Sequence, residues 1–184
     1  MRWYWIDKFL EFESGRRAKA IKCVSLAEDY LTDHFPQYPI FPNSLVIEGL
    51  AQTGGLLVCE HHQYTEKVIL AKLPKVHFHC HARPGDILTY EAKIEYLNSE
   101  GAAVRATSHI GDRLQAEAEI FFAHLNAPWL GTFFSPEWFL TMMRVFGAYK
   151  VGRAADGSPL RPPARLLHSV NSNGSAHEHG GLAT

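Results

Sequence analysis

The feature that most constrains the fold is an apolar segment that follows three closely spaced prolines. The prolines lie within residues 34–43, where they exclude a helix and favour a rigid extended loop. A helix is predicted from about Ser44 to Cys59 or His62, with Asn43 as its N-cap. Because its side chains leave almost no polar face, this helix must be buried on most sides.

The chain downstream of this helix predicts an antiparallel sheet. Apolar and polar residues alternate over 88–96, 104–110 and 114–122, with turn residues between these segments. Two further short strands are predicted upstream, over 3–10 and 18–26. A one-faced sheet and a nearly all-apolar helix can bury each other if the sheet wraps around the helix. The expected fold class is therefore α+β.

The C-terminal third has a different composition. Residues 129–149 are rich in aromatics and methionine, and a helix is predicted to begin near Ser135. Ordinary packing of its apolar stripe onto the sheet is favoured over a lid on an acyl tunnel or a membrane contact; the stripe comprises Trp138, Phe139, Met142, Met143 and Phe146. We therefore divide the chain into a domain over 1–126, an aromatic helical extension over 127–150 and a disordered tail over 151–184.

Composition narrows the function classes. The formal net charge is −1 and no basic run exceeds two residues, which argues against a nucleic-acid partner. The cysteines Cys23, Cys59 and Cys80 form no CxxC pair, so a reducing compartment is expected. Neither a signal peptide nor a membrane span is predicted, so we expect a soluble cytoplasmic protein.

One acid stands out in the apolar segment. Between Asn43 and Cys59 only Glu48 carries a formal charge, and His34 lies fourteen residues upstream of it. A carboxyl group in such a segment is paired, neutralised or used, because burying an unpaired charge is costly. An imidazole supplies the other half of an acid–base pair. Taken singly, the histidine can also cap a loop, and the acid can be satisfied by a backbone partner.

The chain resembles a known family over this region. The run from His34 to Gln52 reads HFPQYPIFPNSLVIEGLAQ and is similar to the motif of the hot-dog-fold 3-hydroxyacyl-acyl-carrier-protein dehydratases of fatty-acid synthesis. The similarity extends over roughly residues 3–125. It implies a hot-dog fold, in which an antiparallel sheet wraps around a long central helix. It also implies a homodimer or a trimer of dimers, with the active site at the dimer interface.

The resemblance implies roles for four residues. His34 would be the base that removes the C2 proton of a 3-hydroxyacyl thioester, and Glu48 would protonate the departing C3 hydroxyl. A backbone N–H near Asn43 would stabilise the thioester oxyanion. Gln52 lies one helical turn beyond Glu48 and would orient its carboxyl group. Such an elimination needs no cofactor, and the thioester carrier would be acyl-carrier protein or CoA.

The chain also departs from the family motif. The family usually has glycine where this chain has Asp33, Gln37 and Asn43. We expect these departures to affect the catalytic efficiency and the shape of substrate that the site accepts more than they affect the fold. They keep open a non-catalytic acyl-thioester-binding subunit, and a hot-dog thioesterase is a further alternative. The acyl chain length and the pathway are not fixed by the motif.

A second histidine cluster offers another reading. His77, His79 and His81 alternate, so on one strand all three would face the same way, as strand-borne metal ligands do. No acid joins them in the sequence, so we expect no metal site. With Lys72, Lys75 and Arg83 nearby, a weakly basic surface for an acidic carrier protein is favoured over a metal site, although charges on a strand usually form only a solvated face.

Overall fold

A computed structural model of the chain describes residues 3–125 and 135–167. Their elements follow one another as β1 (Lys8–Glu13), β2 (Arg17–Cys23), α1 (Tyr30–Asp33), α2 (Asn43–His61), β3 (Lys67–Phe78), β4 (Ile87–Leu97), β5 (Gly101–Ile110), β6 (Arg113–Leu125), α3 (Pro136–Val145), α4 (Ala148–Val151) and β7 (Gly152–Arg153).

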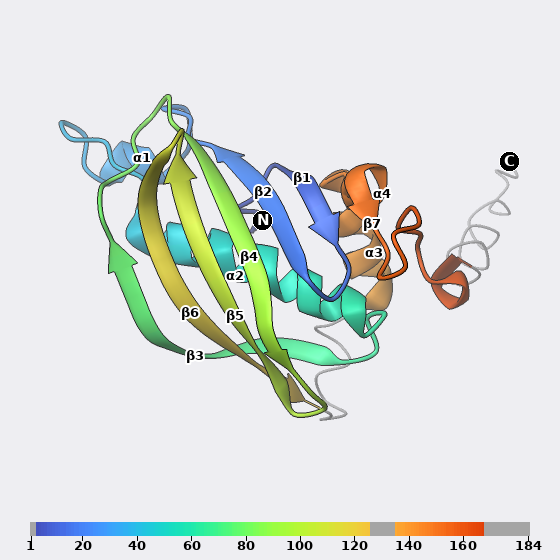
Figure 1. Cartoon of the computed structure of the whole chain (residues 1–184). Helices are drawn as coiled ribbons and strands as arrows, with labels where there is room; N and C mark the ends of the chain where they lie inside the picture. Colours follow the sequence, from blue (N-terminus) through green and yellow to red (C-terminus); the bar gives the residue numbers. More distant parts are fainter. Residues whose placement is uncertain (1–2, 126–134, 168–184) are drawn as a thin grey trace, which may run out of the picture.

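The strands form one seven-stranded sheet that curves around α2 (Figure 1). Its order is β3-β6-β5-β4-β2-β1-β7. Neighbouring strands are antiparallel except β1 and β7, which are parallel. Burial alternates along β4. The side chains of Tyr90 and Ala92 are buried, whereas those of Glu91 and Lys93, which point to the other face of the sheet, are exposed. The predicted α+β class, with a one-faced sheet around a buried helix, is confirmed.

Helix α2 is buried along most of its length, as its apolar sequence predicts. Two of its glycines allow the sheet to approach closely. A Cβ atom on Gly49 would lie 2.5 Å from the ring of Tyr90, and one on Gly54 would lie 3.1 Å from Val104. Gly55 has only ordinary contact distances, to Phe122. Gly49 therefore marks the closest approach of α2 to the sheet among these three glycines.

The predicted N-cap of α2 is wrong by one residue. Pro42 is the N-cap, with φ −58° and ψ 133°, and Asn43 is the first helical residue. The chain is still extended at Pro42, whose carbonyl then accepts hydrogen bonds from the N–H groups of Leu45 and Val46. Once Asn43 has helical backbone angles, its side chain can no longer cap the helix as an N-cap side chain does.

The two N-terminal strands are shorter than predicted. Residues 3–7 precede β1 and belong to no strand, although Trp5 and Ile6 are buried. Residues 24–26 likewise follow the end of β2. A β-strand is defined by a regular ladder of backbone hydrogen bonds to its neighbour and not by apolar content alone. Burial of these flanking side chains therefore does not extend either strand.

The helical extension begins as predicted. The side chain of Ser135 caps α3 and accepts a hydrogen bond from the N–H of Trp138 at 3.4 Å. Four members of the predicted stripe are buried, whereas Trp138 is 46% exposed. Phe146 packs edge-on against Tyr4 and Phe9, and its carbonyl accepts a hydrogen bond from the N–H of Phe9. Residues 127–134 of the extension lie outside the described residues.

The predicted disordered tail is wrong for residues 151–167. Gly152 and Arg153 form β7 beside β1, and the side chains of Leu160 and Leu166 are buried. Few apolar residues are needed here, because the segment adds to an apolar core and a sheet edge that already exist. The rest of the predicted tail, 168–184, lies outside the described residues.

Candidate active site

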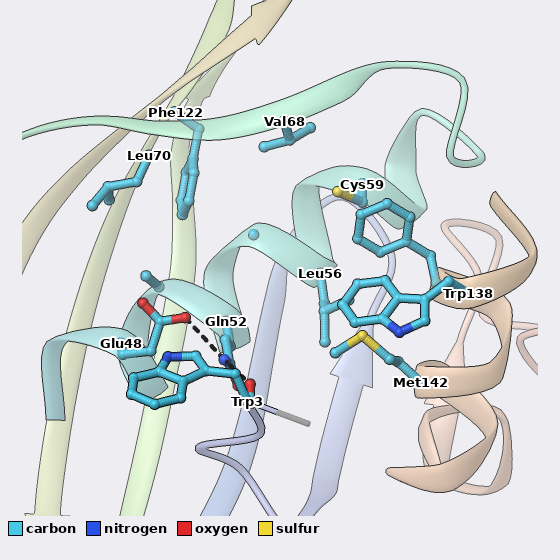
Figure 2. Close-up of a pocket in the computed structure, with 13 residues that line it drawn as sticks. Trp3, Glu48, Gln52, Leu56, Cys59, Val68, Leu70, Phe122, Trp138 and Met142 are labelled. Atoms are coloured by element: carbon cyan, nitrogen blue, oxygen red, sulfur yellow. Dashed lines mark hydrogen bonds between the residues drawn. The ribbon is translucent and has the colours of Figure 1, made fainter. Parts of the chain in front are cut away.

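A pocket of about 350 Å³ lies between α2, β3 and α3 (Figure 2). Its polar groups gather at one end, where Glu48 and Gln52 face it from α2. The remaining lining is predominantly apolar and includes Leu56, Val68 and Phe122. A mostly apolar cavity with a few convergent polar groups is the usual form of a small-molecule site.

A chain of hydrogen bonds holds the carboxyl group of Glu48. The Gln52 side chain accepts from the backbone N–H of Trp5 through Oε1 at 2.9 Å. Its Nε2 donates to the carbonyl of Trp3 at 2.8 Å and to Glu48 Oε1 at 2.9 Å. Because a backbone N–H can only donate, Gln52 Oε1 must face Trp5 and Nε2 must face Glu48. The N-terminal segment thus fixes which end of the amide meets the acid.

The two carboxyl oxygens of Glu48 differ in their hydrogen bonding. Oε1 accepts the hydrogen bond from Gln52. Within residues 3–125 and 135–167 no hydrogen bond to Oε2 is found, so the hydrogen-bonding capacity of this oxygen is not used by the described protein groups. The contact between Glu48 and Gln52 that the helical spacing predicts is therefore present.

His34 lies elsewhere in the same chain. It follows α1, is exposed and stacks on Phe35 with ring centroids 4.5 Å apart. It lines a second pocket of about 630 Å³, which Ser44 and Leu45 at the start of α2 also line. Trp3 lines both pockets. A single chain therefore does not bring His34 and Glu48 into one cavity.

Asn43 begins α2 beside this second pocket. Its side chain is half-buried, and its Oδ1 is a buried acceptor without a partner in the described structure. The neighbouring residues Pro42 and Ser44 line the His34 pocket, so the start of α2, where the first N–H groups of a helix lack helical partners, borders this pocket. Asn43 itself lines neither pocket, although its two neighbours line the one that contains His34, whereas Glu48 and Gln52 line the other.

Cys59 lines the Glu48 pocket and is its one thiol. Burial raises the pKa of Cys59 to about 12. The thiolate, not the thiol, is the nucleophile, so Cys59 is unreactive near neutral pH.

Sequence reasoning missed the anchors of Gln52 and part of the pocket wall. The anchors are backbone groups of Trp3 and Trp5, and no sequence pattern links them to a residue 47 to 49 positions away. Trp138 and Met142 of α3 also line the pocket, although packing onto the sheet was the favoured interpretation of their stripe.

The histidine alternation does not give three ligands on one strand. Strand β3 ends at Phe78, so His77 lies on the strand and His79 and His81 lie beyond it. His79 instead lies 3.6 Å from Glu117 on β6. Within the described parts of the chain no group of three side chains is placed to hold a metal ion. Of the helices described, none has the length and apolarity needed to cross a membrane.

The fold and the polar end of the pocket define a hot-dog protein with a candidate acid–base site. Residues 3–118 match the FabA-like domain, so the chain belongs to the FabA-like domain family.

Similar proteins include the 3-hydroxyacyl-(acyl-carrier-protein) dehydratases FabZ of Pelotomaculum thermopropionicum and Desulforamulus reducens. They are 35% and 36% identical over 119 residues, which are 64% of this chain and 85% and 84% of those proteins. The FabZ of Clostridioides difficile is 35% identical over the same length.

Solved structures share the fold at low identity. The dehydratase heterocomplex ApeI:P of Xenorhabdus doucetiae aligns with a TM-score of 0.59 and 12% identity, over 71% of this chain and 89% of that chain. The smu.793 protein of Streptococcus mutans, bound to acetyl CoA, aligns with a TM-score of 0.51 and 13% identity, over 64% and 87%.

Proposed function

We propose that this protein dehydrates 3-hydroxyacyl thioesters carried by acyl-carrier protein to trans-2-enoyl thioesters and water, in fatty-acid biosynthesis. The observation that carries the proposal is the position of Glu48 in a chain of the FabA-like family. Its carboxyl group accepts a hydrogen bond from Gln52 at the polar end of an otherwise apolar pocket. The FabZ relatives supply the reaction class and the carrier. The free, exposed Cys23 suits a reducing cytoplasm.

In the proposed reaction His34 and Glu48 act as base and acid. The neutral imidazole of His34 takes the C2 proton, and the electrons of that C–H bond form the C2=C3 double bond. The C3–O bond breaks, and the hydroxyl leaves as water with a proton from Glu48. Negative charge on the thioester oxygen is stabilised by the free N–H groups near Asn43 at the start of α2.

The separation of His34 and Glu48 supports an active site shared by two subunits. In one chain the two residues line different pockets. We therefore propose that His34 and the start of α2 of one subunit meet Glu48 and Gln52 of the other. Strand β3 is an edge strand and exposes Leu70, which makes it a candidate for pairing between subunits. A dimer and a trimer of dimers both satisfy this arrangement.

One observation favours the non-catalytic alternative. Asn43 places a side chain where the family usually has glycine, at the helix start that would receive the thioester oxygen. Its Oδ1 is already buried without a partner in the described structure. If the side chain blocks the approach, the protein binds acyl thioesters without dehydrating them.

The test is hydration of a trans-2-enoyl thioester, followed as loss of the conjugated-enoyl absorbance. We expect activity with the acyl-carrier-protein substrate and its loss in both His34→Ala and Glu48→Gln. Glu60→Gln is the matched control, because Glu60 lies on the same helix outside this pocket. Release of free thiol would instead indicate a thioesterase. Binding without turnover on either carrier would favour the non-catalytic subunit.

A further inference from the structure

The extension contributes a wall to the Glu48 pocket. Helix α3 begins at Pro136, beyond the end of the family match at residue 118, yet Trp138, Phe139 and Met142 line the pocket. Figure 2 shows Trp138 and Met142 beside Leu56 and Cys59, whereas Trp3 lies beside Glu48. This part of the cavity is therefore built by a segment outside the matched domain.

The two ends of the pocket differ in polarity. Its lining follows α2 from Glu48 through Gly55 to Cys59, which is roughly 16 Å along the helix at 1.5 Å per residue. The polar side chains Glu48 and Gln52 stand at one end, and the α3 side chains stand at the other. An occupant matching this lining has a polar reacting group near Glu48 and an apolar tail toward α3.

The α3 wall is held firmly in place. Leu140 and Met143 are 1% and 0% exposed. The ring of Phe139 stacks on Tyr64 with 6.2 Å between centroids, and the Tyr64 hydroxyl lies 3.0 Å from that of Tyr149. Side chains packed in this way yield little to an incoming ligand. Helix α3 is therefore anchored to the core, which holds Met142, itself 3% exposed, at a fixed place in the pocket lining.

We propose that α3 is the end wall of the acyl site, and that Trp138 and Met142 limit the length of the acyl chain that the protein accepts. The inference rests on the proposed dehydratase function, which places the reacting carbons at Glu48. The ligand is the alkyl tail of the 3-hydroxyacyl or 2-enoyl thioester. Short tails end before α3, and tails beyond the limit meet Trp138 and Met142.

The experiment is a chain-length series of trans-2-enoyl thioesters with the full chain, measuring kcat/KM for hydration. In Met142→Ala and Trp138→Ala we expect kcat/KM for tails just beyond the wild-type limit to rise about tenfold, the discrimination that one methylene group produces in an apolar pocket. The four-carbon substrate should be unaffected. Trp138 is 46% exposed, so its truncation tests the proposal even if Met142→Ala does not fold.

Two control variants lie on the same helix outside the pocket lining. Leu140→Ala loosens the packing of α3 without widening the pocket, and Val145→Ala truncates a side chain that is 58% exposed. Neither should change the chain-length profile. An unchanged profile in both Met142→Ala and Trp138→Ala, or an equal shift in Leu140→Ala, would overturn the proposal. Absence of hydration at every length in the wild type would instead contradict the dehydratase function itself.

Discussion

Helix α2 carries two half-buried carboxyl groups whose surroundings differ sharply. Glu48 faces an apolar pocket and accepts a hydrogen bond from Gln52, whose amide is itself held at both ends. Glu60 lies twelve residues further on, beside Ser14 and His61, and its Oε2 is buried without a partner in the described structure. Burial raises the pKa of Glu60, and a hydrogen bond with Ser14 offsets part of this shift.

The comparison shows that the setting, not the residue type, gives a carboxyl group its role. Glu48 has a neighbour that fixes its orientation and an open side toward a ligand. Glu60 has incomplete hydrogen bonding and no place in that pocket. We therefore expect Glu48 to matter for activity and Glu60 for stability.

The largest effect is expected at Glu48, the proposed acid. Glu48→Gln should reduce hydration of an enoyl thioester by about 10²- to 10⁴-fold, because the amide cannot take the proton from the attacking water, the reverse of the step proposed for dehydration. The midpoint of thermal unfolding should change little, since glutamine has nearly the same shape. Glu60→Gln should leave the hydration rate as it is. Equal losses in the two variants would remove the distinction between the two acids.

A smaller loss is expected when the support of Glu48 is removed. Gln52→Met keeps the volume of the side chain but cannot donate to Glu48 or accept from Trp5. We expect kcat for enoyl hydration to fall about tenfold to a hundredfold, because the Glu48 carboxyl group loses the hydrogen bond that orients it, while KM changes little. A rise in KM at constant kcat would show instead that Gln52 contacts the substrate.

Helix α2, which carries both carboxyl groups, packs closely against β4 at Gly49. Gly49→Ala would place a Cβ 2.5 Å from the fully buried ring of Tyr90, and we expect a loss of about 1–3 kcal/mol in the free energy of unfolding. Gly55→Ala is the matched control. Its Cβ meets Phe122 at an ordinary 3.4 Å, so stability should rise by up to about 1 kcal/mol. Urea denaturation of both variants measures the difference.

The smallest effect is expected in the pH dependence of stability. A raised pKa means that folded Glu60 keeps its proton at pH values where the unfolded chain has lost it. Stability should therefore fall as the pH rises from the ordinary value of 4.5 through the raised pKa. Glu60→Gln should remove this fall and raise the unfolding midpoint at neutral pH. Identical pH profiles for wild type and variant would contradict the assigned role.

Much of the fold could be predicted from local patterns. The alternation over 88–96, 104–110 and 114–122 predicts β4, β5 and β6, each of which is a few residues longer than its pattern. The apolar run after the prolines predicts α2 to within a residue at its start. Such periodicities report which side of an element faces a core, and that information is local.

The folded residues beyond the extension helix could not be predicted in the same way. The segment 152–160 is poor in large apolar residues, yet β7 pairs with β1 and Leu160 is buried. Composition measures whether a segment can form a core of its own, whereas here the segment uses a core formed by the rest of the chain.

The sequence by itself determined the helix, the meander and the acid that stands alone in an apolar run, because these depend on neighbours a few positions apart. Only the tertiary structure decided that Trp3 and Trp5 hold Gln52, that α3 lines the pocket of Glu48, and that His34 of the same chain lies in a different pocket. These contacts join residues tens of positions apart. Their geometry follows from how the sheet wraps the helix, which no local pattern encodes.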